Sequence, residues 1–172
     1  MSKLLKAAVL MLVPLMVFAV SCQKSQEKVA EKATEKAIEH ETNEKAEVNY
    51  GKNKVTVKTK EGKFELSEKG NVKVPEGFPD DIYIYPGARV AMSMKQPEGL
   101  SVTLVSNDEM NVIADKYSAN MKKNGWTEEG VAQMSQMRML SYKKGDREAM
   151  IQMAPGSEEG KTMITIMAQE NK

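Results

Sequence analysis

The chain has 172 residues, with 25 Lys and Arg against 24 Asp and Glu, so its net charge is +1. A dedicated nucleic-acid-binding domain carries a strongly basic surface, so we expect no nucleic-acid partner. One Cys and one His leave no residues for an internal disulfide, a CxxC metal site or a multi-histidine centre. We therefore expect no cofactor.

The first residues have the pattern of a secretory signal. Lys3 and Lys6 are followed by an uncharged run from Ala7 to Val20. A membrane-spanning helix needs about 20 apolar residues, so this run is too short to be one. Its length and its basic start are typical of a signal peptide.

The run ends in Ala19-Val20-Ser21-Cys22, which resembles the lipobox of bacterial lipoproteins. The resemblance implies that residues 1–21 are removed and that Cys22 is linked to a diacylglyceryl group. It also implies a lipid anchor on the periplasmic face of a bacterial cell membrane. Gln23 follows in place of the Asp that signals inner-membrane retention in enteric lipoproteins, which favours the outer membrane over the inner.

Residues 22–47 are predicted to be a charged tether. They contain a four-residue repeat of Glu, Lys and Ala, which favours a helix by propensity. The period places the glutamates at i,i+4, where like charges repel. Val29, Ala33 and Ala37 form only a thin apolar stripe. We therefore expect a marginal helix that acts as a solvated spacer, about 38 Å long if helical.

Residues 48–74 are predicted to be a separate basic segment with a β-hairpin at Lys54 to Ser67. Val55, Val57, Phe64 and Leu66 alternate around a turn at residues 60–63. Lysines at this position suit an exposed edge hairpin. Attraction to anionic lipid headgroups is the alternative interpretation.

The stretch from Val74 to Ala88 resembles a motif of small bacterial envelope lipoproteins that reads approximately P-x-x-F-P-x-D-x-P-x-Y-P-G-A. Tyr83 stands where those proteins commonly have a second Pro. In that family the motif is followed by an α+β unit, and no biochemical activity comes with the resemblance. The matching residues are Pro75, Phe78, Pro79, Asp81, Tyr85, Pro86, Gly87 and Ala88.

Residues 75–172 are predicted to form the folded α+β domain. Residues 89–95 and 100–106 alternate as two strands, and Met110, Ile113, Ala114, Tyr117 and Met121 give one apolar helix face. Four more strands are expected at residues 126–133, 137–143, 148–154 and 162–169. The predicted fold is an antiparallel sheet with one amphipathic helix on a face, in the order β-β, β-β-α-β-β-β-β.

Methionine is unusually frequent, and 11 of the 14 lie between Met92 and Met167. Strand alternation places Met163 and Met167 on the face opposite Ile164 and Ile166, which we expect to face the helix. The methionine face needs a cover, which we rank as the 54–67 hairpin first, a partner second and a soft metal third. The metal alternative is Cu(I) or Ag(I) on Met137, Met139, Met163 and Met167, since thioethers are soft ligands.

Catalytic constellations are scarce. The folded part contains no Cys or His, and no phosphate-binding GxxxxGK motif occurs. The carboxylate pairs Asp80-Asp81, Glu128-Glu129 and Glu158-Glu159 are expected to be solvated. We therefore predict no enzyme, but a membrane-anchored lipoprotein whose domain has a binding or structural role, with an envelope protein as partner. The alternatives are a soft-metal binder and, behind it, a hydrolase of envelope polymers.

Overall fold

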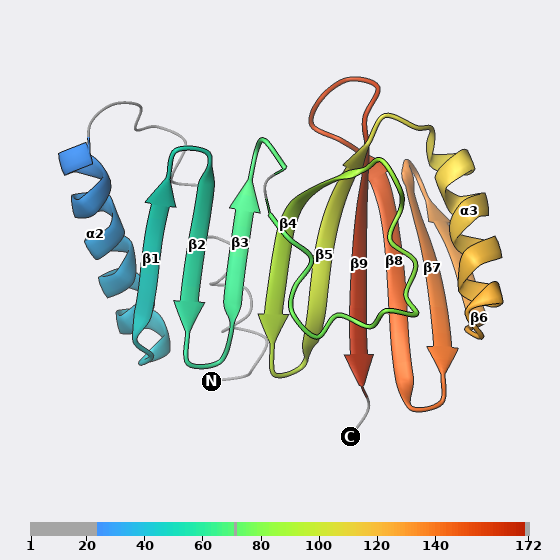
Figure 1. The fold of residues 1–172 in the computed structure, drawn as a ribbon, viewed down its shortest axis with the longest axis horizontal. Coiled ribbons are helices and arrows are strands. Elements are labelled where there is room, and N and C mark those ends of the chain that lie inside the picture. The colour runs from blue at the N-terminus through green and yellow to red at the C-terminus, as the bar shows by residue number, and fades with distance from the viewer. Residues whose placement is uncertain (1–23, 71, 171–172) are drawn as a thin grey trace.

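The computed structural model describes residues 24–70 and 72–170, and Figure 1 shows them as one large antiparallel sheet with a helix near each end. The nine strands lie in the order β1-β2-β3-β4-β5-β9-β8-β7-β6. The helices are α2 (Lys24–Thr42) and α3 (Met110–Lys123). The strands are β1 (Ala46–Gly51), β2 (Lys54–Thr59), β3 (Lys63–Ser67), β4 (Arg89–Gln96), β5 (Gly99–Ser106), β6 (Thr127–Met134), β7 (Met137–Lys144), β8 (Arg147–Pro155) and β9 (Thr162–Glu170).

The main hydrophobic core lies on one face of β5, β9, β8 and β7, which we call the front face. Alternation turns Val102, Leu104, Ile151, Ile164 and Ile166 to this side, and all five are fully buried. On this face α3 packs over β6, β7 and β8, and residues 72–88 cross in front of β5, β9 and β8 (Figure 1). The predicted orientation of Ile164 and Ile166 toward the helix is therefore confirmed.

A smaller core lies on the back face, at the other end of the sheet. Ile38 of α2 is only 2% exposed and packs with Val48, Val57 and Phe64. Val57 is directly opposite both Val48 and Phe64 across the strands, so the three side chains share one face. The two helices thus cover opposite faces of the sheet, and each covers only one end.

The predicted fold class is wrong in its architecture. The structure has a single nine-stranded antiparallel sheet with two helices, where the sequence analysis expected one helix on a smaller sheet. The strand β1 and the packing of α2 were both missed. The 54–67 hairpin is present as β2 and β3, but β3 pairs with β4. The hairpin therefore extends the sheet. The expectation that it covers the methionine face is wrong.

The helix α2 is not the solvated spacer that the repeat predicted. Its buried side is marked by Ile38, whereas Val29 of the expected stripe is 69% exposed. The carboxylates of Glu31 and Glu35 accept hydrogen bonds from the amides of Tyr50 and Val48, at 2.8 and 3.0 Å. These amides belong to the outer edge of β1, so the repeated glutamates satisfy an edge that would otherwise invite another strand.

The first turn of α3 has no side-chain cap. The helix begins at Met110 with Glu109 as its N-cap, and Glu109 makes no side-chain capping bond. The Ser106 hydroxyl accepts a hydrogen bond from the amide of Asp108 instead.

Within residues 24–70 and 72–170, neither helix has the length and hydropathy needed to cross a membrane.

Candidate functional site: a clasped segment and an open methionine face

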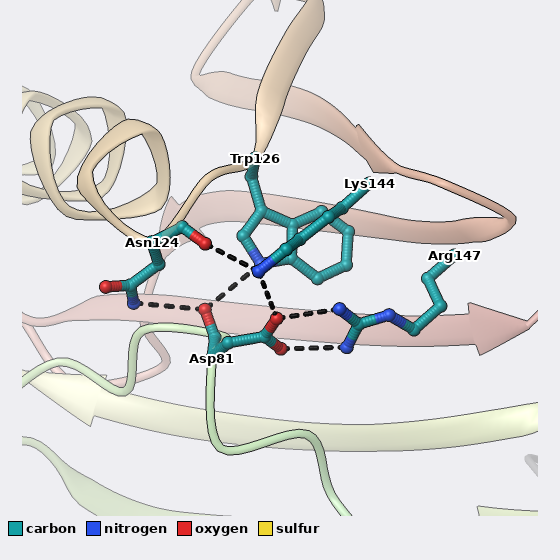
Figure 2. A network of polar contacts seen from close by, with 5 residues as sticks. All are labelled: Asp81, Asn124, Trp126, Lys144 and Arg147. Carbon is teal, nitrogen blue, oxygen red and sulfur yellow. Dashed lines mark hydrogen bonds and ion pairs between the residues drawn. The ribbon is translucent and has the colours of Figure 1, made fainter.

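The segment of residues 72–88 is held against the sheet by a clasp centred on Asp81 (Figure 2). The guanidinium of Arg147 donates to both carboxylate oxygens of Asp81, at 2.9 and 2.7 Å, and Lys144 donates to Oδ2 at 2.7 Å. The backbone carbonyl oxygen of Asp81 accepts hydrogen bonds from the side-chain amide of Asn124 and from the Trp126 indole, each at 3.0 Å. The bidentate geometry makes the Arg147 contact the strongest of these.

The electrostatics of the clasp suit a structural role. The hydrogen bonds from Arg147 and Lys144 lower the pKa of Asp81 from 3.8 to about 2. A carboxyl group that stays ionised in this way is a poor proton donor near neutral pH. The Arg147 guanidinium also lies 5.1 Å from the centre of the Trp126 ring. The clasp therefore fixes the segment against the α3–β6 connection and the β7–β8 turn.

A second polar contact anchors the end of the same segment to α3. The Tyr85 hydroxyl donates to Oδ2 of Asp108 at 2.5 Å and accepts from Lys116 at 3.2 Å. Burial of Tyr85 and its bond to Asp108 raise the pKa of the phenol, so it is not an activated nucleophile. The ring of Tyr85 stacks with that of Tyr117, with their centroids 6.3 Å apart.

The proline-rich motif is thus architectural in this chain. Phe78 and Tyr85 fill the main core, and Asp81 forms the clasp. Gly87 has a φ of 80°, a conformation that favours glycine. These residues lay the segment across the sheet as a cover for its front face, which explains the spacing of the motif without a catalytic role.

Five methionines lie on the back face of β7, β8 and β9, and we call this surface the methionine face. Met150 and Met163 are 36% and 38% exposed, and Met150 lies directly opposite Met167 across two neighbouring strands. Among the described residues, α3 packs on the other face and α2 packs at β1, so neither helix covers this surface. The methionine face consists of Met137, Met139, Met150, Met163 and Met167.

The four methionines named for a soft metal share this face but do not converge. Met137 and Met139 are on β7, whereas Met163 and Met167 are on β9, with β8 between them. Two strand spacings amount to about 9.6 Å, and Met163 and Met167 are themselves four residues apart. The Met137 sulfur also accepts a hydrogen bond from Gln152 at 3.0 Å. The described part of the chain holds no cluster of His, Cys, Asp and Glu suited to a metal ion.

The remaining candidate residues are dispersed. Cys22 lies outside the described residues. Asp81 is in the clasp, and Glu128 accepts hydrogen bonds from Ser118 and from Tyr142. Burial and the nearby Glu128 carboxylate raise the pKa of Tyr142 to about 12. Glu158 pairs with Arg89 at 2.9 Å. No two of the three predicted carboxylate pairs are brought together by the contacts of this structure.

Comparison with known families matches residues 89–162 to a family described as START domain-like. The matched region runs from β4 through α3 and β8 to the first residue of β9, which is less than half of the chain. No curated protein and no solved structure matches the chain. Domains of this description are generally ligand-binding.

Proposed function

We propose that this protein is a lipid-anchored binding protein of the bacterial cell envelope. In this proposal Cys22 carries a diacylglyceryl group, and the domain lies on the periplasmic side of the membrane, the outer membrane in preference to the inner. The domain has no catalytic role, and it binds an envelope protein through the methionine face. The lipobox pattern supports the anchor, and the START domain-like match supports the binding role.

One observation carries the binding role: the methionine face is a methionine-rich surface that both helices leave open, with Gln152, Thr165 and Ser141 between the methionines. Met150, Met163 and Met167 come from adjacent strands, and the first two are more than a third exposed. A contiguous apolar patch on a soluble domain commonly marks an interaction site. Methionine side chains are flexible and polarizable, and they are frequent on surfaces that adapt to a protein partner.

The binding role can be tested by site-specific photo-cross-linking in intact cells. A photoreactive residue replaces Met163 in the full chain, and the matched control places it at Val112. Val112 is 45% exposed on the outer side of α3, on the opposite face of the sheet. We expect a discrete adduct with one envelope protein from position 163 and none from position 112.

The specificity of that adduct is checked with a second substitution. Met150→Gln should abolish the cross-link from position 163 while the urea midpoint of the purified domain stays unchanged. An adduct between two copies of the chain would show that the face joins protomers. Equal labelling from both positions would refute the binding role of the methionine face.

The anchor is tested separately with Cys22→Ser. Because the thiol accepts the lipid, the variant should lose metabolic acyl labelling and leave the membrane fraction in a soluble or uncleaved form. A variant that stays in the membrane fraction with unchanged mobility, in cells where the native chain takes up no acyl label, would refute the lipoprotein assignment.

A further inference from the structure

The direction of α2 determines which ends of the strands lie near the start of the described chain. Glu31 contacts the amide of Tyr50, and Glu35, one turn later, contacts the amide of Val48. The helix therefore runs antiparallel to β1. Its first residues lie beside the C-terminal end of β1, at the same end of the strands as the β1–β2 turn (Figure 1).

The heights of these elements along the strand direction nearly coincide. From Glu31 back to Lys24 the helix rises by seven residues, or about 10 Å. From Tyr50 the strand continues only to Gly51, and the turn at Lys52 and Asn53 follows. The helix start and the β1–β2 turn therefore form one rim of the molecule, and the β2–β3 turn lies at the opposite rim.

Cys22 precedes Lys24 by two residues, which can span at most about 7 Å of extended chain. Given the lipid attachment proposed above, on which this inference rests, the anchor has almost no slack. We infer that the sheet stands directly on the membrane with its strands upright. The rim at the β1–β2 turn then lies against anionic phospholipid headgroups. The packed helix replaces the 38 Å spacer that its repeat suggested.

The chemistry of the rim is compatible with that partner. Lys52 in the β1–β2 turn and Lys69 after β3 are exposed, as is Lys28 on the first turns of α2. Glu68 lies on the same rim, and Glu158 there is paired with Arg89. The rim also exposes Glu27 and Glu159, so its charge is mixed. The three lysines can each be attracted to anionic headgroups, but the orientation rests on the short reach from Cys22 to the start of α2.

The orientation has a consequence for the methionine face. The strand β2 is six residues long, so the two rims are about 20 Å apart. With the strands standing upright on the membrane, the methionine face points sideways along the membrane plane. A partner of this face would therefore be reached laterally, by a protein held at the same membrane.

The orientation can be measured with two matched cysteine variants of the full, lipidated chain. Lys52→Cys and Lys60→Cys place a thiol in exposed turns at the two ends of β2. Cys22 is the only native cysteine, and its thiol is blocked once it carries the lipid. Each variant is labelled with a fluorophore and reconstituted into vesicles that contain one third phosphatidylglycerol and a headgroup-linked quencher.

We expect the label at position 52 to be quenched at least threefold more strongly than the label at position 60. Trp126 fluorescence verifies that both variants are folded. A chain that takes up acyl label but shows equal quenching, or stronger quenching at position 60, would overturn the orientation and leave the anchor intact. A chain without acyl label would instead overturn the anchor, so the two failures are distinguishable.

Discussion

The Asp81 clasp gives the sharpest quantitative prediction. The substitution Asp81→Asn preserves the backbone carbonyl that accepts from Asn124 and Trp126, but it removes the carboxylate that binds Arg147 and Lys144. The side chain of Asn is nearly the same size as that of Asp. The variant therefore isolates the charge–charge part of the clasp from its packing.

The size of the effect follows from the pKa of Asp81, which the clasp lowers from 3.8 to about 2. Each pKa unit corresponds to about 1.4 kcal/mol, so the full shift would correspond to roughly 2.5 kcal/mol. The side chains of Asp81, Lys144 and Arg147 are 27%, 34% and 33% exposed, so solvent screens the interaction. We expect Asp81→Asn to lower the free energy of unfolding by about 1–2 kcal/mol at pH 6.

The pH dependence follows from the direction of the shift. The native carboxyl has the lower pKa, so its stabilisation is fully present above about pH 5 and is lost as the pH falls toward 2. The difference between the native chain and Asp81→Asn should therefore shrink by about half at pH 3. An opposite trend would contradict the assignment of the shift to the clasp.

The assay is urea unfolding followed by the fluorescence of Trp126, the only tryptophan, whose ring lies against Arg147 in the clasp. The matched control is Asp80→Asn, which removes the neighbouring exposed carboxylate outside the clasp. We expect this control to change the stability by less than about 0.5 kcal/mol. If Asp81→Asn and Asp80→Asn were equally mild at pH 6, the argument that the clasp stabilises the fold would be refuted.

Two further pairs of variants test the two faces of the sheet. Ile164→Ala should lower the free energy of unfolding by about 2–5 kcal/mol as a core truncation. Met163→Gln, at a side chain 38% exposed, should lower it by less than about 1 kcal/mol. Equal losses in the same urea titration would contradict the assignment of the faces. Ile38→Ala should cost about 2–3 kcal/mol and speed hydrogen exchange of the Val48 amide, while Val29→Ala, at a residue 69% exposed, should change neither by much; unchanged exchange of Val48 in the first variant would contradict the docking of α2.

The local elements were largely predictable because each has a strong hydrophobic period. The alternation around Ile164 and Ile166 predicted β9 and the direction of its side chains, and the apolar positions from Met110 to Met121 predicted α3. The four strands expected after α3 are β6 to β9, with ends that agree to within one residue. These patterns are local, so they can be recognised without knowing the partners of the residues.

The packing of α2 was not predictable from the same patterns. Its attachment depends on one buried side chain, Ile38, and on carboxylates that accept from edge amides of β1. A hydrophobic period cannot show such contacts, and the i,i+4 glutamates suggested repulsion. The clasp is similar: the motif contains Asp81, but its partner Arg147 lies 66 residues away in the sequence. The place of β9 between β5 and β8 is likewise set by tertiary pairing.

The placement of the helices on opposite faces leaves two uncovered areas with different chemistry. On the front of β2 and β3, Lys54 and Lys63 flank Glu65 at 2.6 and 3.1 Å, so this area is a charged network that water can solvate. On the back of β8 and β9, the uncovered area is the methionine face. Charged groups need no further cover. Binding of a partner that removes an apolar side chain from water is favourable and lowers the free energy of the complex. This contrast is why we locate the protein partner at the methionine face and not on the charged front of β2 and β3.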